Sequence, residues 1–402
     1  MPYRELNFDS HMVAICMSEV KDMYRMHFER GCQYVAKRMY QKILAVDFDS
    51  FINAGCHQRT SQRNGYRNGY RSRSLLTSVG QLDLKIPRDR AGQYQPDLFE
   101  RYRRVDSSLE DTIRAMFLQG VSTRKVGDIL DVLCGERLSA SKVSTVVREL
   151  DQAVSDYANR PLEDDYIFLF LDAISVKIRF ELKAKKVKLL VAYGIKTDGT
   201  REMISFGRAN SESTACWKSF LDNLYVRGLK GRTLQLIAMD GGGGLWSAIE
   251  DVYPLVKHQL CWVHKLRNVA KYCPKRYQQE CVSQAAKIMY AKSSAKAASE
   301  FRAWKKRWLN KIPRAVNCLE KDFDKLIPVF GFPQNMRKMI RTTNVIERCF
   351  REVRRRLKVM GYFQNSRSCD RIIYAIFNYF NSKWQRPKTK INTVKQLTRT
   401  AA

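Results

Sequence analysis

The chain has 402 residues, a length that predicts about two to four domains, and its 72 Lys and Arg against 40 Asp and Glu give a formal charge of +32. Such an excess indicates a surface that attracts polyanions, and the pI of about 9.8 is typical of nucleic-acid-binding proteins. We expect no membrane partner, because no segment has the roughly 18 consecutive apolar residues of a membrane span and no signal peptide opens the chain. The eleven scattered cysteines predict free thiols in a reducing compartment.

The first part of the chain predicts a helical region, residues 1–55, followed by a basic arm with short strands, residues 56–106. The stretch CHQRTSQRNGYRNGYRSRSL contains no acid, and we interpret it as a loop whose Tyr66 and Tyr70 are suited to stacking on bases. A solvated linker is the alternative. The alternating pattern of residues 77–90 predicts a pair of short strands. The candidate DNA contacts of the arm are Arg59, Arg63, Arg67, Arg71 and Arg73.

Residues 107–160 predict several helices. Two of them flank a glycine-containing turn, and Ser122 and Ser139 stand where helix N-caps belong. The second of these helices begins near Ala140 and carries Lys142 and Arg148 as candidate DNA contacts. This pattern suits a helix-turn-helix that places its second helix in a major groove. A generic helical hairpin is the alternative, because helix pairs are common.

From residue 161 the chain changes to short apolar runs. DYIFLFLDAISVKIRF, KKVKLLVAYGI and REMISFGRANS predict three successive strands. A helix, the strand LQLIAMD, a second helix and a short strand near VKHQLCWVH follow, so the fold class is α/β with a mixed sheet. Beyond it the sequence predicts a lysine-rich helical region, a strong helix in VIERCFREVRRRLKVM and a basic tail, residues 386–402.

Two acids lie on the predicted apolar strands, where an unpaired carboxylate is costly. Asp172 lies within one strand and Asp240 ends another, and a divalent cation between them would compensate both charges. Carboxylate oxygens suit Mg²⁺ or Mn²⁺. Glu347 is the candidate third acid, because the other charges of its helix are nearly all basic. Its alternative role is helix capping, since Asn344 and Glu347 have the spacing of a capping-box variant.

Four motifs together resemble the Mutator-type bacterial insertion-sequence transposases of the DDE superfamily: LDAISVKIR, AMDGGGGLWSAI, HQLCWVHKLRNV and TTNVIERCFREVRRRLKVMGYF. The resemblance covers roughly residues 60 to 385. It implies a ribonuclease H-like catalytic core in two parts, residues 161–265 and 339–385, around an all-helical insertion, residues 266–338. Asp172, Asp240 and Glu347 match the family's catalytic acids, and Cys261 and His264 match its Cys-x-x-His signature.

This resemblance implies an enzyme that binds the terminal inverted repeats of its insertion sequence, nicks the ends and transfers the strands. The three acids would hold two Mg²⁺ or Mn²⁺ ions per active site. The partners would be double-stranded DNA, at the ends and at the target, and a second copy of the chain, in the nucleoid-associated cytoplasm of a bacterium. Arg351 and Arg354, on the helix face of Glu347, would also contact DNA.

The four glycines Gly241–Gly244 are more than this family commonly shows after its second acid. We interpret them as room for DNA, or a metal-bound phosphate, to approach the backbone, and as a means for the next helix to start close to the strand. Drift in a tolerant turn is the alternative.

Three other interpretations remain open. His258, Cys261 and His264, with Cys273 or Cys281, have a metal-like spacing, but Cys-x-x-His alone is a weak zinc signal. The sequence HKLR matches the His-x-x-Arg motif of tyrosine recombinases, with Tyr290 as the candidate nucleophile, yet no convincing set of further arginines accompanies it. A non-catalytic DNA-binding protein derived from a transposase is the third alternative, against which the presence of all three acids argues.

Overall fold

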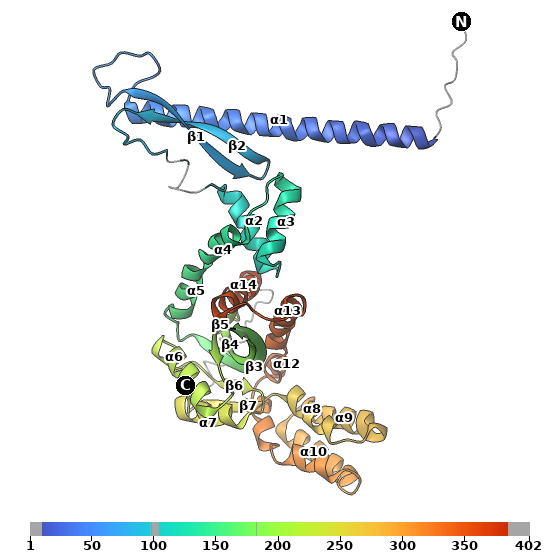
Figure 1. Cartoon of the computed structure of the whole chain (residues 1–402). Coiled ribbons are helices and arrows are strands. Elements are labelled where there is room, and N and C mark those ends of the chain that lie inside the picture. The colour runs from blue at the N-terminus through green and yellow to red at the C-terminus, as the bar shows by residue number, and fades with distance from the viewer. Residues whose placement is uncertain (1–9, 97, 99–103, 182, 385–402) are drawn as a thin grey trace. The chain divides into compact units, whose positions relative to one another are not determined.

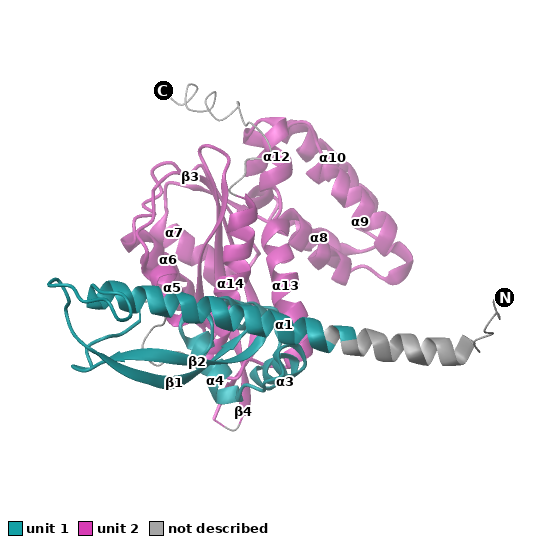
Figure 2. Cartoon of the chain, turned by 90° about the horizontal axis from the view of Figure 1, so that it is seen from above, with its two compact units in different colours: residues 1–149 teal, residues 150–402 magenta. Residues whose placement is uncertain are grey.

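The computed structural model describes residues 10–96, 98, 104–181 and 183–384, with the backbone alone for residues 10–23 and 25. The chain forms two compact units, residues 1–149 and 150–402 (Figure 2). The predicted basic tail, residues 386–402, lies outside the described residues. Within the described part of the chain, no helix has the length and hydropathy that crossing a membrane requires.

The first unit begins with a long helix, α1 (Ser10–Ile52), packed on an antiparallel hairpin of β1 (Arg67–Thr77) and β2 (Gly80–Asp89) (Figure 1). Of the stretch interpreted as a basic loop or arm, the part from Arg67 onward is strand β1, and the expected pair of strands within residues 77–90 is wrong, because β2 pairs with the basic stretch before it. Backbone pairing with β2 extends β1 through a basic stretch, and composition alone does not reveal that pairing. The core of this part contains Leu44, Phe48 and Ile52 of α1 and Leu82, Leu84 and Ile86 of β2.

Three helices complete the first unit: α2 (Ser107–Leu118), α3 (Thr123–Cys134) and α4 (Ala140–Arg148). Both predicted N-caps are confirmed, since Ser122 Oγ accepts from Lys125 N at 3.3 Å and Ser139 Oγ accepts from Lys142 N at 3.2 Å. Gly135 ends α3 with φ of 66°, a left-handed conformation that glycine adopts without strain. The apolar faces of the helices pack on one another through Ile113, Val126, Leu130 and Val143.

The second unit is built on a five-stranded mixed sheet in the order β5-β4-β3-β6-β7. The first three strands form an antiparallel meander, and β6 and β7 run parallel to β3. The predicted α/β class with a mixed sheet is therefore confirmed. The strand bounds are β3 (Tyr166–Phe180), β4 (Lys183–Lys196), β5 (Arg201–Ala209), β6 (Leu236–Met239) and β7 (Lys257–Leu260).

Helices cover both faces of this sheet (Figure 1). The helices α6 (Thr214–Val226) and α7 (Gly243–Val252) pack together on one face. On the other face, α14 (Ser366–Trp384) packs against α5 (Leu150–Asn159) and α13 (Asn344–Met360). The strand interiors are buried, which explains why β3 and β6 read as continuous apolar runs.

A helical segment leaves the sheet after β7 and returns before α13 (Figure 1). Its own core contains two tryptophans whose ring nitrogens are satisfied: Trp304 Nε1 donates to Cys281 O at 3.0 Å, and Trp308 Nε1 donates to Gln284 Oε1 at 2.9 Å. The helices are α8 (Trp262–Lys271), α9 (Lys275–Met289), α10 (Ser294–Trp308), α11 (Pro313–Glu320) and α12 (Gln334–Ile340), with short 3₁₀ turns at Asp324–Leu326 and Pro328–Gly331.

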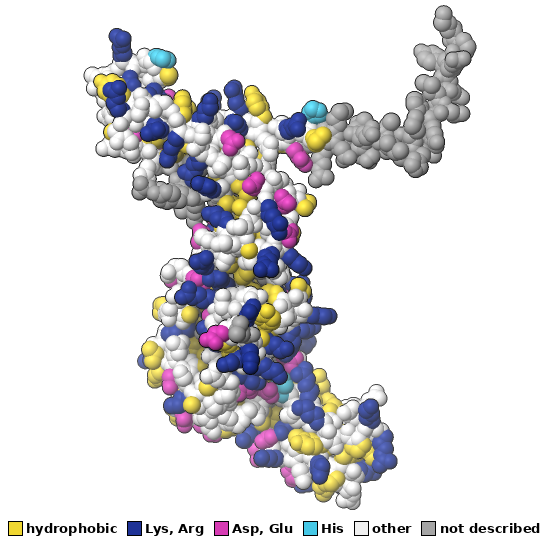
Figure 3. Space-filling model, viewed as in Figure 1, with side chains coloured by type: hydrophobic (Ala, Val, Ile, Leu, Met, Phe, Trp, Pro, Cys, Tyr) yellow, Lys and Arg dark blue, Asp and Glu magenta, His cyan; other side chains and the backbone are white. Residues whose placement is uncertain are grey.

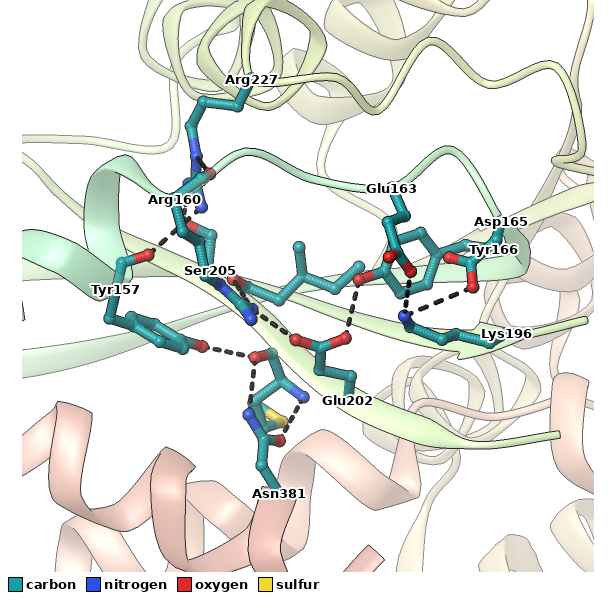
Figure 4. Close-up of polar contacts among 12 residues, drawn as sticks. Tyr157, Arg160, Glu163, Asp165, Tyr166, Lys196, Glu202, Ser205, Arg227 and Asn381 are labelled. Atoms are coloured by element: carbon teal, nitrogen blue, oxygen red, sulfur yellow. Dashed lines mark hydrogen bonds and ion pairs between the residues drawn. The ribbon is translucent and has the colours of Figure 1, made fainter. Parts of the chain in front are cut away.

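A polar network joins the start of β3 to the edge strand β5 (Figure 4). Tyr166 Oη donates to Glu202 Oε2 at 2.8 Å, and Arg160 forms an ion pair with the same carboxylate. Asn381 of α14 accepts from Met203 N at 2.7 Å. The side chain of Asn381 thus satisfies a backbone group of the edge strand β5, and the whole network fixes this end of the sheet.

Candidate active site

Asp172 lies in the middle of the sheet, on β3. Asp172 is only 5% exposed, and its Oδ1 accepts a hydrogen bond from Ala173 N at 2.7 Å. Burial raises the pKa of Asp172 to about 7, and the negative charges of Asp240 and Glu347 add to that rise, whereas His264 opposes it. The carboxyl therefore lies in a poorly solvated position where a cation would stabilise its charge.

Asp240 is brought beside Asp172 by strand register. In the parallel pair of β3 and β6, Leu171 lies opposite Met239, so the next residues of the two strands are the two acids. Neighbouring strands lie about 4.8 Å apart, and opposite residues point to the same face. Asp240 is half-exposed, and its Oδ1 accepts from Gly241 N at 2.7 Å.

The glycines after Asp240 divide into two kinds. A Cβ at Gly244 would lie 2.6 Å from Glu212 O and 2.8 Å from Thr214 N, so glycine there allows α7 to pack on the loop before α6. A Cβ at Gly241, Gly242 or Gly243 would meet nothing within 4 Å. The helix begins at Gly243, two residues earlier than Leu245, where the sequence LWSAI suggests its start. Close packing within the chain thus accounts for Gly244, while open space surrounds the other three.

Glu347 reaches the site from the first turn of α13. Its carboxylate forms a bidentate pair with Arg267, in which Arg267 Nη2 donates to Oε2 at 3.0 Å. The hydrogen bonds from Arg267 outweigh partial burial and lower the pKa of Glu347. The helix N-cap is Thr343, not Asn344, and the Glu347 side chain bonds to Arg267 instead of turning back to the cap. The capping-box interpretation is therefore wrong.

His264 of α8 lies between two of the acids. Its Nδ1 is 3.7 Å from Asp240 Oδ1, and its Nε2 is 3.3 Å from Glu347 Oε1. Burial disfavours the imidazolium, but hydrogen bonding to Cys261 and the charges of Asp240 and Asp172 outweigh it and raise the pKa of His264 to about 9. The positive charge of His264 therefore lies between Asp240, at the end of β6, and Glu347 on α13.

Cys261 fixes the start of the helix that carries Glu347. Its buried Sγ accepts from Thr343 N at 3.4 Å and lies 3.6 Å from Thr343 Oγ1. The neighbouring Trp262 N donates to Arg341 O at 3.2 Å, and Gln259 Nε2 donates to Ile340 O at 3.1 Å. These bonds fasten residues 340–343 to the end of β7, which follows the strand of Asp240.

The other candidate zinc ligands have different partners. His258 Nε2 lies 3.2 Å from Tyr253 O, and its ring packs against Trp246. Cys273 Sγ donates to Val269 O at 3.3 Å. As the described side chains stand, no three His, Cys, Asp or Glu groups among them are arranged to hold a metal ion. The three acids nevertheless have the oxygen donors that Mg²⁺ and Mn²⁺ prefer.

The sequence analysis gives no role beside the acids to one residue of the candidate site. Arg267 enters it only through the His-x-x-Arg motif, although its place one turn after His264 on α8 is the signal that both side chains reach the same acids. Tyr290, the residue proposed for a recombinase, stacks under Arg341 with the guanidinium carbon 4.6 Å from its ring centre. Of the arginines on α13, Arg354 contributes to the lowered pKa of Glu347, and Arg351 is exposed.

The candidate DNA contacts of the first unit differ in how free their side chains are. Arg67 forms an ion pair with Asp49 at 2.7 Å, and Arg63 donates to Gly65 O at 2.7 Å. Arg59, Arg71 and Arg148 are exposed, Lys142 and Arg73 are half-buried, and Tyr66 and Tyr70 are exposed. Exposure therefore favours Arg59 and Arg71 over the other arginines of the arm.

The chain belongs to the Mutator family of transposases, because the model of this family matches residues 14–387. The chain is 35% identical over 362 residues to the transposase for insertion sequence element ISRM5 of Rhizobium meliloti, with 90% of each chain covered. It is 34% identical to the transposase for insertion sequence element IS256 in transposon Tn4001 of Staphylococcus aureus, over 86% of this chain and 89% of that one. A search of solved structures finds the Drosophila P element transposase strand transfer complex, at 12% identity and a TM-score of 0.30, over 75% of this chain and 84% of that one.

Proposed function

We propose that the chain binds the ends of an insertion sequence, nicks them and joins them to target DNA. Family membership supports this activity, and the relatives are transposases of insertion sequences by name. The observation that carries the proposal is the meeting of Asp172, Asp240 and Glu347 around His264, although 175 residues separate the first acid from the last (347 − 172). The strand order, an antiparallel meander followed by two parallel strands, supports a ribonuclease H-like core.

In this proposal Asp172, Asp240 and Glu347 hold two Mg²⁺ or Mn²⁺ ions. Bound there, the ions would activate first a water and then a 3′-hydroxyl, and would stabilise the leaving oxygen. The register of β3 and β6 fixes Asp172 and Asp240 side by side, while Cys261 and Thr343 position the helix of Glu347. No Ser, Cys or Tyr nucleophile is required, because in-line displacement at phosphorus depends on positioning and charge.

Recognition of the ends is assigned to the first unit. We assign base and backbone contacts to α4, the second helix of the candidate helix-turn-helix, and backbone contacts to the arginines of the arm. Arg351 and Arg354 on α13 are assigned to DNA beside the acids. Two ends must be processed together, so the active species is a homodimer or larger.

The test is incubation of the purified chain with duplex DNA that carries the ends of its own insertion sequence, with and without Mg²⁺. We expect strand nicking that needs Mg²⁺ and that falls at least 100-fold in Asp172→Asn, Asp240→Asn and Glu347→Gln. DNA binding without metal should persist in all three. Nicking at the parent rate in any one variant would remove that residue from the triad, and binding without any nicking by the parent would favour a non-catalytic protein.

A further inference from the structure

The hairpin of β3 and β4 extends beyond the sheet to which it belongs (Figure 2). The strand β6 pairs with β3 only from Phe168 to Leu171, and β5 pairs with β4 only from Lys188 onward. Past these points β3 and β4 pair with each other, and the one further bridge among the described residues joins Ile178 to Phe363. The end of the hairpin is therefore a two-stranded arm on the catalytic unit.

This arm is strongly basic. Residues 177–188 hold six basic side chains and one acid, Glu181. Lys and Arg side chains gather around its tip, which points toward the viewer in Figure 3. Lys188 forms an ion pair with Glu212 at 2.7 Å, and no ion pair of the other five occurs within the described part of the chain. The six are Lys177, Arg179, Lys183, Lys185, Lys186 and Lys188.

The strand register places like charges face to face. Lys177 lies directly opposite Lys186, and Arg179, two residues further along, points to the same face. Like charges directly opposite one another destabilise a pair of strands, so this face is unfavourable in the isolated chain. A polyanion seated on it would remove the repulsion and release counterions. At the tip, Phe180 is 39% exposed, as suits contact of its ring with sugar or base.

The basic face of the hairpin is separate from the face of the acids. Lys177 and Arg179 follow Asp172 by five and seven residues. Because successive side chains of a strand alternate between its two faces, residues at odd offsets from Asp172 point away from the face of its carboxyl. A duplex seated on the basic face would therefore lie on the opposite side of β3 from a bond held at the acids.

We propose that the β3–β4 hairpin is a DNA-binding arm whose Lys177, Arg179 and Lys186 contact the phosphate backbone of a DNA duplex. This binding does not depend on the proposed chemistry, because it rests only on the charge and projection of the hairpin.

The experiment compares the full chain with a triple variant, Lys177→Gln, Arg179→Gln and Lys186→Gln. The control variant, Lys230→Gln, Arg232→Gln and Lys257→Gln, removes the same charge from exposed positions before β6 and at the first residue of β7, remote from the hairpin. Affinity for duplex DNA with insertion-sequence ends is measured without metal over a range of salt concentrations. We expect the hairpin variant to lose affinity at least about 10-fold and to lower the salt slope by about 2.7, from about 0.9 per phosphate contact.

Unfolding is measured on the same samples, and the hairpin variant should melt no lower than the parent, because the substitutions relieve repulsion. Hydroxyl-radical footprints of the parent and the control variant should show protection of the DNA backbone that the hairpin variant lacks. Equal affinity and equal salt slope in the two variants would overturn the proposal that the hairpin binds DNA. A parent that binds DNA but never nicks it would refute the proposed chemistry while leaving the binding comparison valid.

Discussion

Arg267 holds Glu347 through both terminal nitrogens of its guanidinium group, so this acid already has a cationic partner within the chain. His264, one turn earlier on α8, places a second cation near the same carboxylate. A divalent cation bound by Glu347 must compete with these charges for the same oxygens.

Replacing Arg267 by Gln should therefore strengthen metal binding. We expect the Mg²⁺ concentration that gives half of the thermal stabilisation to fall several-fold, because stabilisation by a ligand follows its affinity for the folded state. The loss of a half-exposed ion pair should cost at most about 1 kcal/mol without metal. Lys271→Gln on the same helix is the control, since Lys271 donates to Asn268 and forms no ion pair with an acid among the described residues. Identical Mg²⁺ titrations for the two variants would contradict the competition.

Replacing Asp172 by Asn should stabilise the metal-free protein. At pH 8 the carboxyl is charged in both the folded and the unfolded chain, and burial penalises only the folded one, as its pKa of about 7 indicates. We expect a gain of roughly 1–3 kcal/mol in the free energy of unfolding, measured by denaturant titration in the presence of a chelator. Added Mg²⁺ should stabilise the parent and not the variant. A loss of stability in Asp172→Asn without metal would show that the carboxylate is compensated within the fold.

Replacing Cys261 by Ala should destabilise the protein without removing a metal. The change leaves the buried Thr343 N without its acceptor, and an unsatisfied buried donor costs about 1–3 kcal/mol. The melting temperature checks this expectation, with Cys216→Ala as the control because Cys216 is a half-buried free cysteine outside the candidate zinc ligands. Stoichiometric zinc in the parent, lost from Cys261→Ala, would support a zinc site instead.

Alanine substitutions separate the roles of the four glycines. Gly244→Ala should lower stability by about 1–3 kcal/mol, because its Cβ would overlap Glu212 O at 2.6 Å. Gly242→Ala should leave the melting temperature nearly unchanged, since its φ of −71° suits any residue and its surroundings are open. If that space receives DNA, Gly242→Ala should slow nicking while it folds normally. Parent activity in a fully folded Gly242→Ala would favour drift in a tolerant turn.

The arginines of the arm should respond in two groups. Arg59→Ala with Arg71→Ala should reduce the salt slope of DNA binding by about 1.8, about 0.9 for each exposed arginine that meets a phosphate. Arg67→Ala should chiefly lower the melting temperature, because Arg67 pairs with Asp49 and donates to Ala54 O. An unchanged slope in the double variant would reduce this part of the arm to a linker.

Local sequence by itself determined most of the strands and helices of the second unit, the N-caps at Ser122 and Ser139, and the three acids as candidates. These features depend on the period of apolar residues and on side chains that bond to their own helix, so neighbouring residues are enough to predict them. The mixed α/β class followed from the same pattern, whereas the strand order, with β6 beside β3, came only from the structure.

The tertiary structure alone decided which side chains meet. Arg267 and Glu347 form an ion pair although 80 residues separate them. Cys261 accepts a hydrogen bond from Thr343, at the start of α13, across 82 residues. No local sequence pattern predicts either contact. The tertiary structure also decided that packing within the chain requires glycine at Gly244, the last of the four consecutive glycines. Strand pairing also decided the extent of β1, which continues as far as its partner β2 does. In the same way, the β3–β4 hairpin extends beyond the sheet because β5 pairs with β4 only from Lys188 onward. The composition of a strand does not show where its partner ends.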